Sequence, residues 1–480
     1  MSELLKLSEN SEFFRYFLEI SKIPHGSGNC GRIADYICGF AKEKGLPCYR
    51  DAADNLLITK EATEGYENHP AVIIQGHIDM VAEKTPESKR DLLNEGIEVL
   101  CDGEYLYAKD TTLGGDDGIA VAYAMAILAD DALKHPKIEA LFTSDEEIGL
   151  IGASQFDTSR LTGKTLINID SEEEGIFTVG CAGGVRVDMP LLDADTRVSV
   201  DGAYKLTVSG LFGGHSGVEI HKGRANAAKL ISRVLLSLGD IRLCSIVGGN
   251  MDNAIMRSAE AVFHSDMSFD TISRIVALKA QLLREAYLGK EEDISLVIEP
   301  LYGEFSAFSK EDTARIAAMI DTLPSSVVKM SENIEGLPES SANIGIVRID
   351  TEGDDSYVTA SLRSENKEGK LELIDRLYEI CELYGFDISL RGDYPGWAYR
   401  KDSALRDTAR ALYIEKYGKE PEILTIHAGL ECGIFADRIE GLDCISIGPD
   451  MSGIHTTEEK LSVKSSIRVY DFVCDLIARM

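Results

Sequence analysis

Imidazole and carboxylate side chains follow an apolar segment in the first part of the chain. In the sequence AVIIQGHIDMV, residues 71–81, an apolar run ends at Gly76 and is followed by His77 and Asp79. A buried strand over this run would place both groups at its carboxyl end, where open α/β sheets hold their functional sites. Imidazoles and carboxylates are also the usual protein ligands of metals such as Zn²⁺. The segment therefore predicts a functional strand end.

The same combination of an apolar run and polar side chains recurs along the chain. The other apolar runs are 138–142, 166–169, 423–426 and 445–447, and the polar residues after them include Glu146, Glu147, Asp170, His427 and His455. A further position is Asp116, in a Gly-rich turn that precedes an apolar helix pattern. If these segments share one sheet, their polar ends form a ring of imidazoles and carboxylates. A two-metal hydrolytic site requires such a ring.

Each of these residues also has a simpler explanation. A single buried histidine is more often a hydrogen-bonded core residue than a metal ligand. An aspartate after Gly-Gly, such as Asp116 or Asp117, often caps the following helix, and adjacent glutamates commonly lie on a solvated surface. These explanations would scatter the residues over helices and linkers, whereas here they gather at strand ends. The grouping therefore favours a metal site.

The composition limits the classes of protein to consider. A chain of 480 residues exceeds what one hydrophobic core normally supports, so we expect two domains. The net charge of −32 argues against nucleic acid or an anionic membrane as a partner, because both would repel it. The N-terminal segment is charged and helically patterned, unlike a signal peptide, and the ten cysteines form no C-x-x-C pair. We therefore expect a cytoplasmic protein with reduced thiols.

The pattern of expected elements changes twice along the chain. Residues 1–186 alternate strand and helix patterns, and the ligand-bearing pattern resumes over residues 397–480. Residues 187–396 instead mix alternating strand segments with amphipathic helices and hold one strong motif, GGHSG. We therefore predict an α/β catalytic domain, built from both flanking stretches, with a mixed, largely parallel central sheet flanked by helices. The middle stretch is predicted to be an inserted α+β domain.

Taken in order, the motifs resemble those of a known superfamily. They are H-x-D at 77–79, G-G-D-D-G at 114–118, D-E-E-x-G at 145–149, N-x-D at 168–170, G-H-S-G at 214–217 and a late histidine. This series resembles the co-catalytic zinc aminopeptidase, carboxypeptidase and aminoacylase superfamily. The segments IHAGLECGIF and GGHSGVEIHKGRANA are similar to those of the aminoacyl-histidine dipeptidases, also called peptidase D or bacterial cytosolic nonspecific dipeptidases. The resemblance covers essentially the whole chain.

The resemblance implies a set of metal ligands. One metal would be held by His77, Asp116 and Asp170, and the other by Asp116, Glu147 and His455, so that Asp116 bridges the two. Two Zn²⁺ ions per subunit are the first expectation. Because the set is rich in oxygen ligands, Mn²⁺ or Co²⁺ would also fit it.

The resemblance also implies catalytic roles for residues around the metals. Asp79 would lie behind His77 and orient its ring. Glu146 would be the general base that takes a proton from a water bridging the metals and later protonates the leaving amine. The peptide bond between Asp116 and Asp117 is expected to be cis. His215 in the inserted domain would polarise the scissile carbonyl, in its own or in the partner subunit, and the alternative is a loop histidine beside flexible glycines.

For the substrate's ends the sequence offers candidates rather than an assignment. The candidates for binding the C-terminal carboxylate are Asn253, Arg257, Arg363 and the backbone around Gly429. His427 and Glu431 lie in the family's HAGLE segment and are expected to line the pocket. Each of the carboxylate-binding candidates could equally be a surface or capping residue.

The function implied by the resemblance is metal-dependent hydrolysis of unblocked dipeptides, including Xaa-His dipeptides, with β-alanyl-histidine as a further candidate. The inserted domain would then serve as a lid and dimerisation domain in a homodimer. Alternatives within the superfamily are an N-acyl amino acid deacylase and an aminopeptidase. More remote ones are a two-metal phosphoesterase, disfavoured because no Lys/Arg cluster accompanies the acidic ring, and a non-catalytic binding protein, disfavoured because Glu146 and the full ligand set are present.

Overall fold

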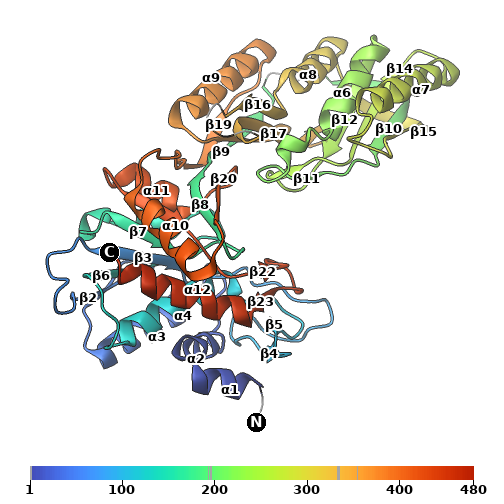
Figure 1. Ribbon diagram of the computed structural model, residues 1–480. Coiled ribbons are helices and arrows are strands. Elements are labelled where there is room, and N and C mark those ends of the chain that lie inside the picture. The colour runs from blue at the N-terminus through green and yellow to red at the C-terminus, as the bar shows by residue number, and fades with distance from the viewer. Residues whose placement is uncertain (1–2, 193, 195–196, 332–333, 335, 354) are drawn as a thin grey trace. The chain divides into compact units, whose positions relative to one another are not determined.

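The computed structural model describes residues 3–480 except 193, 195–196, 332–333, 335 and 354, and is shown in Figure 1. It divides into two compact units. The first comprises Met1–Cys181, Tyr399–Thr425 and Leu430–Met480, and the second Ala182–Ala398 and Ile426–Gly429. Each unit has its own hydrophobic core, since one cluster of buried side chains lies wholly in the first and another wholly in the second. Separate cores are the usual solution for a chain of this length.

The first unit is built on a mixed sheet. Within the described residues its strand order is β1-β2-β6-β3-β7-β21-β8-β20. The strands are β1 (Cys48–Arg50), β2 (Leu56–Lys60), β3 (Val72–His77), β6 (Ile138–Thr143), β7 (Thr165–Asn168), β8 (Ile176–Cys181), β20 (Glu422–Ile426) and β21 (Asp443–Ser446). The four neighbours β6, β3, β7 and β21 are parallel, whereas β1, β2 and β8 pair antiparallel. The predicted mixed, largely parallel sheet is confirmed.

The parallel strands bring their carboxyl ends to one edge of the sheet. Every residue of β3 is buried, as expected for a parallel strand covered on both faces. Gly76 in β3 is required by close packing, because a Cβ there would lie 2.4 Å from the Cβ of Ala120 and 2.5 Å from Oδ2 of Asp117. The glycine that ends the apolar run therefore lets a helix approach the strand just before His77.

Helices flank this sheet, and a small sheet lies beside them. The helices are α1 (Glu3–Asn10), α2 (Glu12–Ile20), α3 (Gly31–Lys44), α4 (Gly115–Ala129), α5 (Ile151–Gln155), α10 (Ala404–Tyr417), α11 (Glu431–Arg438) and α12 (Val463–Ile477). Helix α4 is apolar on all sides and almost wholly buried, because it packs on β3 and β6 while α2 and α12 pack on it. The small sheet has the order β22-β23-β5-β4, with β4 (Val99–Cys101), β5 (Tyr105–Ala108), β22 (Met451–Ser452) and β23 (Lys460–Ser462).

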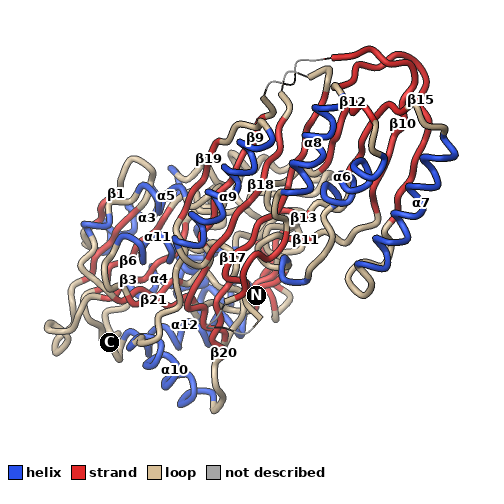
Figure 2. Tube along the Cα trace, turned by 90° about the horizontal axis from the view of Figure 1, so that it is seen from above, coloured by secondary structure: helices blue, strands red, loops and turns tan. Residues whose placement is uncertain are grey.

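The second unit is an antiparallel sheet with helices on one face, as Figures 1 and 2 show. Its described strands run in the order β15-β10-β14-β12-β17-β18-β9-β19, with β16 paired to β17. They are β9 (Gly183–Pro190), β10 (Arg197–Ser209), β12 (Ile241–Gly248), β14 (Ala259–Ser265), β15 (Ser295–Phe308), β16 (Ser326–Met330), β17 (Pro338–Asp350), β18 (Tyr357–Ser364) and β19 (Ser389–Tyr394). The helices are α6 (Ala227–Leu238), α7 (Phe269–Ala286), α8 (Lys310–Thr322) and α9 (Lys367–Tyr384). This is the expected α+β pattern.

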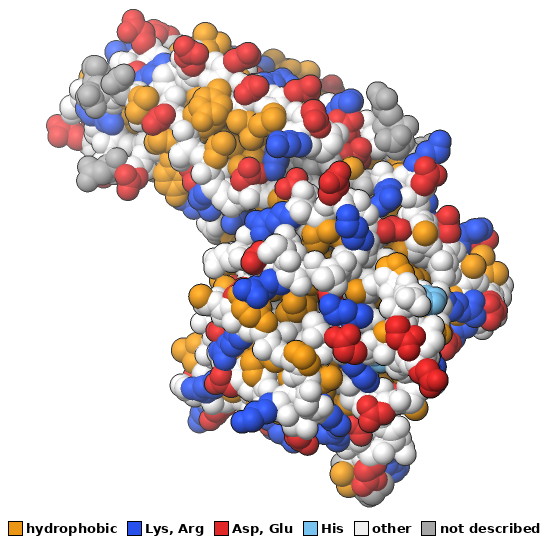
Figure 3. Space-filling model, turned by 90° about the vertical axis from the view of Figure 1, so that its left-hand side faces the viewer, with side chains coloured by type: hydrophobic (Ala, Val, Ile, Leu, Met, Phe, Trp, Pro, Cys, Tyr) orange, Lys and Arg blue, Asp and Glu red, His pale blue; other side chains and the backbone are white. Residues whose placement is uncertain are grey.

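The surface carries charge of both signs. On the face drawn in Figure 3, Asp and Glu side chains are interspersed with Lys and Arg side chains. The net charge of −32 is therefore not gathered into a single acidic field on that face. Among the described residues, no helix is long and apolar enough to cross a membrane.

Candidate dinuclear metal centre

The imidazole of His77 lies at the end of β3 and faces two carboxylates. His77 is 1% exposed, and its Nε2 atom lies 3.1 Å from Oδ1 of Asp116 and 3.8 Å from Oδ1 of Asp170. Asp170 follows β7, the strand that pairs with β3 in parallel. Adjacent parallel strands thus deliver these groups to the same edge of the sheet, as the sequence pattern predicted for strand ends.

Asp116 presents its two oxygens to two different histidines. Its Oδ1 atom faces His77, and its Oδ2 atom lies 3.1 Å from Nε2 of His455. Asp116 is the second residue of α4, but its backbone is not helical, and the peptide bond to Asp117 is cis, as expected. The residue therefore leaves the helix geometry at the point where its carboxylate meets both imidazoles.

Glu147 completes the second group of side chains. Its Oε1 atom lies 2.9 Å from Nε2 of His455, yet this buried oxygen forms no hydrogen bond with any described residue. A buried carboxylate oxygen without a hydrogen bond is costly in a protein interior unless another partner, such as a cation, satisfies it. Beside His455 and Asp116, the position of Glu147 therefore suits a cation ligand.

The spacing of these donors fits divalent cations. Two groups, His77 with Asp116 and Asp170, and Asp116 with Glu147 and His455, have ligand atoms within 4.8 Å of one another. Donors bound about 2.0–2.1 Å from a tetrahedral Zn²⁺ lie about 3.3 Å apart, close to the separations found here. The residues present thus fit two cations that share Asp116.

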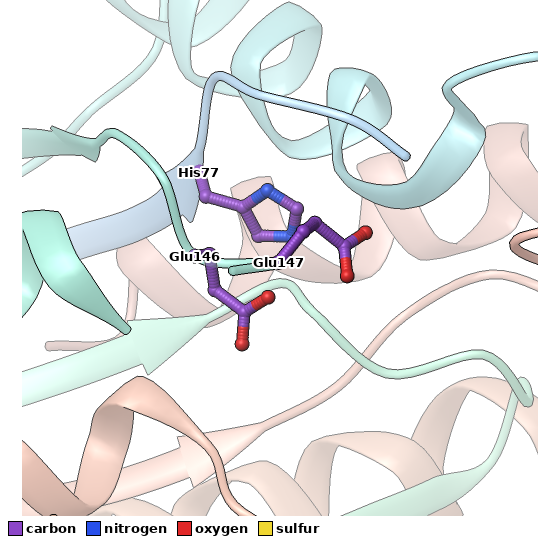
Figure 4. A group of neighbouring side chains, drawn as sticks. All are labelled: His77, Glu146 and Glu147. Carbon is purple, nitrogen blue, oxygen red and sulfur yellow. The ribbon is translucent and has the colours of Figure 1, made fainter. Parts of the chain in front are cut away.

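Glu146 lies beside the same donors but points elsewhere. Figure 4 shows that the carboxyl groups of Glu146 and Glu147 diverge from adjacent backbone positions near the His77 ring. His77, Glu146 and Glu147 also form a group with ligand spacing, so distance alone would permit Glu146 as a ligand. Burial, and then the negative charges of Asp170 and Glu147, raise the pKa of Glu146 well above its ordinary value, although the charge of His77 opposes this. Such a carboxylate is suited to accept a proton.

Asp79 lies behind His77 and connects three segments. Its Oδ1 atom is 3.5 Å from Nδ1 of His77 and accepts a hydrogen bond from the backbone N–H of Glu146 at 3.0 Å. Its Oδ2 atom accepts from the hydroxyl of Ser27 at 2.7 Å and from the N–H of Glu147 at 3.3 Å. Burial alone would raise the pKa of Asp79, but the hydrogen bond and charge of His77 lower it overall. Nδ1 of His77 also lies 3.1 Å from the backbone carbonyl oxygen of Asp79, so Asp79 contacts the imidazole and holds the Glu146–Glu147 backbone.

A buried polar network that the sequence analysis did not foresee lies beneath these residues. The Glu431 Oε2 atom accepts hydrogen bonds from Gln75 at 2.5 Å and from Thr143 at 2.6 Å, so α11 is tied to β3 and β6. Glu431, which is expected to line the substrate pocket, has a side chain with no exposed surface. Burial raises its pKa to about 7. The structure thus places Glu431 as an internal support of two strands that carry His77 and the Glu146–Glu147 pair.

In the second unit, His215 lies next to a cavity of about 730 Å³. The short strands β11 (Gly214–His215) and β13 (Ala254–Ile255) pair antiparallel, so the backbone brings His215 close to Asn253. The cavity is lined by His215, Asn253 and Arg257, among others. The Nδ1 atom of His215 accepts hydrogen bonds from the N–H groups of Gly217 and Val218, both at 3.2 Å. Nε2 is therefore the nitrogen that carries the proton in the neutral ring.

The other substrate-binding candidates form a separate cluster around Tyr394, a residue that the sequence analysis missed. Arg363 donates from Nη1 to the Tyr394 hydroxyl at 3.0 Å, and its buried Nε atom has no hydrogen-bond partner among the described residues. Gly429 lies against the same ring, because a Cβ there would be 2.7 Å from it. His427 Nε2 lies 2.7 Å from the hydroxyl of Ser341. Burial, followed by the charge of Arg363, lowers the pKa of His427 to about 3, so its ring is neutral at pH 7.

Comparison with known proteins agrees with this geometry. A family model described as "Peptidase family M20/M25/M40" matches residues 73–479. The cytosol non-specific dipeptidase of Escherichia coli (strain K12) is 35% identical over 482 residues, covering 99% of each chain. The crystal structure of aminoacylhistidine dipeptidase from Vibrio alginolyticus superimposes with a TM-score of 0.88 at 36% identity, covering 98% of this chain and 96% of that one.

A more distant solved structure shares the fold. The aminopeptidase PepT from Bacillus cereus ATCC 10987 superimposes with a TM-score of 0.57 at 16% identity, covering 97% of each chain. The resemblance to aminoacyl-histidine dipeptidases that the motifs indicated is therefore confirmed over the whole chain. The chain belongs to peptidase family M20/M25/M40, a family of metal-dependent peptidases.

Proposed function

We propose that this protein is a cytoplasmic dipeptidase with a dinuclear metal centre that hydrolyses unblocked dipeptides, including Xaa-His dipeptides. The observation that carries this proposal is the placement of Asp116, whose two carboxylate oxygens each lie 3.1 Å from a different histidine. A carboxylate shared in this way suits a bridge between two cations. The relatives with 35–36% identity are themselves named as dipeptidases, which supports the substrate class.

Two Zn²⁺ ions are the proposed cofactors. One ion would be held by His77, Asp116 and Asp170. The other would be held by Asp116, Glu147 and His455. Mixed imidazole and carboxylate ligands suit Zn²⁺, while Mn²⁺ and Co²⁺ remain chemically acceptable to the same set. When bound, the cations supply Lewis acidity, which polarises the scissile carbonyl and lowers the pKa of a water molecule.

Glu146 is proposed as the general base and general acid. It accepts a proton from the attacking water as the new C–O bond forms, and it delivers this proton to the amine nitrogen as the C–N bond breaks. Its raised pKa favours both steps, because such a group can hold the proton between them. Asp79 fixes the backbone N–H of Glu146 and so keeps the carboxyl in place.

His215 is proposed to stabilise the developing negative charge on the carbonyl oxygen. Its Nδ1 atom accepts hydrogen bonds from two backbone N–H groups, so the proton of the neutral ring lies on Nε2, and Nε2–H is the donor proposed to meet the carbonyl oxygen. We further propose that the second unit, corresponding to the predicted insertion of residues 187–396 in a catalytic domain of residues 1–186 and 397–480, acts as a lid and dimerisation domain. In the proposed homodimer, His215 acts on the metal centre of its own or of the partner subunit.

The substrate's C-terminal carboxylate is proposed to bind Arg363, supported by the backbone at Gly429. Arg363 is nearly buried, and its guanidinium is oriented by Tyr394, so it offers a preformed cation to a small anion. Asn253 and Arg257, which line the cavity beside His215, are the alternative anchors. His427, held by Ser341, lies near this group and is proposed to shape the pocket rather than to carry charge.

A substrate panel tests the proposal against its rivals. Xaa-His dipeptides, β-alanyl-histidine, acetylated amino acids, a tripeptide and a phosphate monoester are assayed before and after chelation and with Zn²⁺ restored. Cleavage of dipeptides that is lost with the chelator and restored by metal is expected. Preference for acetylated amino acids would indicate a deacylase, preference for the tripeptide an aminopeptidase, and turnover of the phosphate ester alone a phosphoesterase. No cleavage by the metal-loaded protein would contradict an enzymatic function.

A further inference from the structure

A buried carboxylate outside the ligand set is held by the backbone of the Gly-Gly turn. Glu459 is 3% exposed. Its Oε2 atom accepts hydrogen bonds from the N–H groups of Leu113 at 2.7 Å and Gly114 at 3.1 Å. Its Oε1 atom accepts from those of Gly115 at 2.8 Å and Asp116 at 3.4 Å. One side chain thus satisfies four consecutive backbone donors at the start of α4.

The turn is shaped to receive this carboxylate. Gly114 adopts a left-handed conformation with φ of 71°, which turns successive N–H groups toward a common point. A Cβ on Gly115 would lie only 3.1 Å from Oε1 of Glu459, so glycine allows the close approach. The positive end of the α4 dipole adds to the attraction for a negative group. Gly114 and Gly115 therefore form an anion-binding turn, and the carboxylate of Glu459 occupies it.

The same contact joins the two segments that carry Asp116 and His455. Asp116 is the last of the four donors, and His455 lies four residues before Glu459 in a tight segment where Glu459 N–H donates to the Thr456 carbonyl at 3.2 Å. His455 itself has a left-handed backbone with φ of 60°. Its Nε2 atom reaches Asp116 across 339 positions of sequence. Glu459 therefore holds the backbone of one ligand segment directly against that of the other.

We propose that Glu459 is a positioning residue for the metal centre. Glu459 holds the 113–116 turn against the 455–459 segment and so sets the distance between Asp116 and His455. This distance in turn sets the affinity for a divalent cation at the position formed by Asp116, Glu147 and His455. The inference about Glu459 rests on the proposed function in one respect: the position formed by Asp116, Glu147 and His455 must bind a divalent cation. A purely structural role would instead lower the stability of the fold without favouring one metal position over the other.

The test measures metal binding to metal-free protein with Zn²⁺ in competition with a chromophoric chelator. Glu459→Gln keeps the size of the side chain but turns an amide N–H₂ toward two N–H donors, so at least half of the contact is lost. We expect one of the two affinities to be unchanged and the other to fall about 10–100-fold, the usual effect of removing a group that orients a ligand. Glu458→Gln removes the same charge from the exposed neighbouring residue and should leave both affinities unchanged.

A second variant approaches the contact from its other side. Gly115→Ala introduces a Cβ 3.1 Å from Oε1 while leaving the Glu459 carboxylate in place. It should weaken the same metal position, and the double variant should lose less than the sum of the single losses because both act on one contact. The visible absorption spectrum of the Co²⁺-substituted protein reports the ligand geometry independently of turnover. If the Glu459→Gln variant does not fold, the metal affinities and the Co²⁺ spectrum of the Gly115→Ala variant still test the inference.

Two results would overturn the inference. One is Glu459→Gln protein that binds both cations with the affinities of the wild type. The other is an equal loss at both positions together with a lower melting temperature of the metal-free protein, which would mark Glu459 as a stabiliser of the fold alone. Wild-type protein that binds fewer than two cations would instead contradict the dinuclear site of the proposed function, so the two failures are distinguishable.

Discussion

His455 Nε2 lies 3.1 Å from Oδ2 of Asp116, although 339 positions of sequence separate the two residues. The other oxygen of Asp116 lies at the same distance from Nε2 of His77. A single carboxylate therefore stands between two imidazoles, one at the end of β3 and one in a loop close to the C-terminal helix. Loss of this carboxylate should affect both metal positions, whereas loss of either histidine should affect one.

Metal content of variants measures this relationship. Asp116→Ala is expected to lose both cations and all activity, because both ligand groups include Asp116. His455→Gln should lose one cation and retain the other. Elemental analysis of dialysed protein is the measurement, and His221→Gln, at an exposed histidine outside the centre, is the matched control. Asp116→Ala protein that keeps two cations would rule out the bridging role.

Glu146→Gln separates catalysis from metal binding. An amide cannot accept the proton of water, so kcat should fall by about 10²–10⁴-fold, the range attributed to general acid–base catalysis. Both cations should stay bound, because Glu146 is not assigned as a ligand. Glu147→Gln, the same change one residue later, should instead reduce metal content. A normal rate for Glu146→Gln would contradict the mechanism, and loss of metal from it would show that Glu146 is a ligand.

His215→Gln tests both the role and the origin of this histidine. The variant should bind two cations normally but show a lower kcat, because a donor to the carbonyl oxygen is lost. Mixing unfolded or dissociated His215→Gln and Glu146→Gln protein then allows mixed dimers to form. If His215 serves the partner's centre, one site of each mixed dimer is intact, and an equal mixture should recover about a quarter of wild-type activity. No recovery, despite mixed dimers detected by mass spectrometry, would place His215 in its own subunit's site.

The lowered pKa of His427 predicts that the free energy of unfolding changes with pH. Its pKa is lowered to about 3 in the folded protein, mainly by burial, from an ordinary value of 6.5. Above pH 6.5 the ring is neutral in both folded and unfolded chains. As the pH falls from 6.5 toward 3, the unfolded chain binds a proton that the folded chain does not, so stability decreases by up to about 1.4 kcal/mol per pH unit.

The corresponding experiment compares urea unfolding of wild type and His427→Gln at pH 7.5 and pH 5. Glutamine retains a polar partner for Ser341 but cannot take up this proton. The stability of the wild type relative to the variant should therefore be lower at pH 5 than at pH 7.5. If the stability difference between wild type and variant is the same at pH 7.5 and pH 5, the lowered pKa of His427 is contradicted.

The sequence was sufficient for those parts of the centre that depend on local pattern. His77 and Asp170 follow apolar runs that predicted buried strands, and the carboxyl ends of parallel neighbours meet at one edge of the sheet. Asp116 lies in a Gly-Gly turn before a helix that is apolar on every side, so the sequence also predicted its place at the start of α4. The cis bond to Asp117 came from the resemblance to relatives, since no pattern of residue types encodes it.

The tertiary structure decided which distant groups meet and how deeply they are buried. Glu459 looks like an ordinary surface glutamate in the sequence, yet it fills the Gly-Gly turn. Glu431 belongs to the HAGLE segment, but the sequence does not show that Gln75 and Thr143 donate to its carboxylate. Tyr394 gained its place beside Arg363 only through the pairing of β19 and β18 with β9. Local residue types determine which strand or helix forms, but contacts across hundreds of residues arise from the packing of those elements. Burial and the neighbouring charges, which together shift the pKa of carboxyls such as Asp79 and Glu431, follow from that packing.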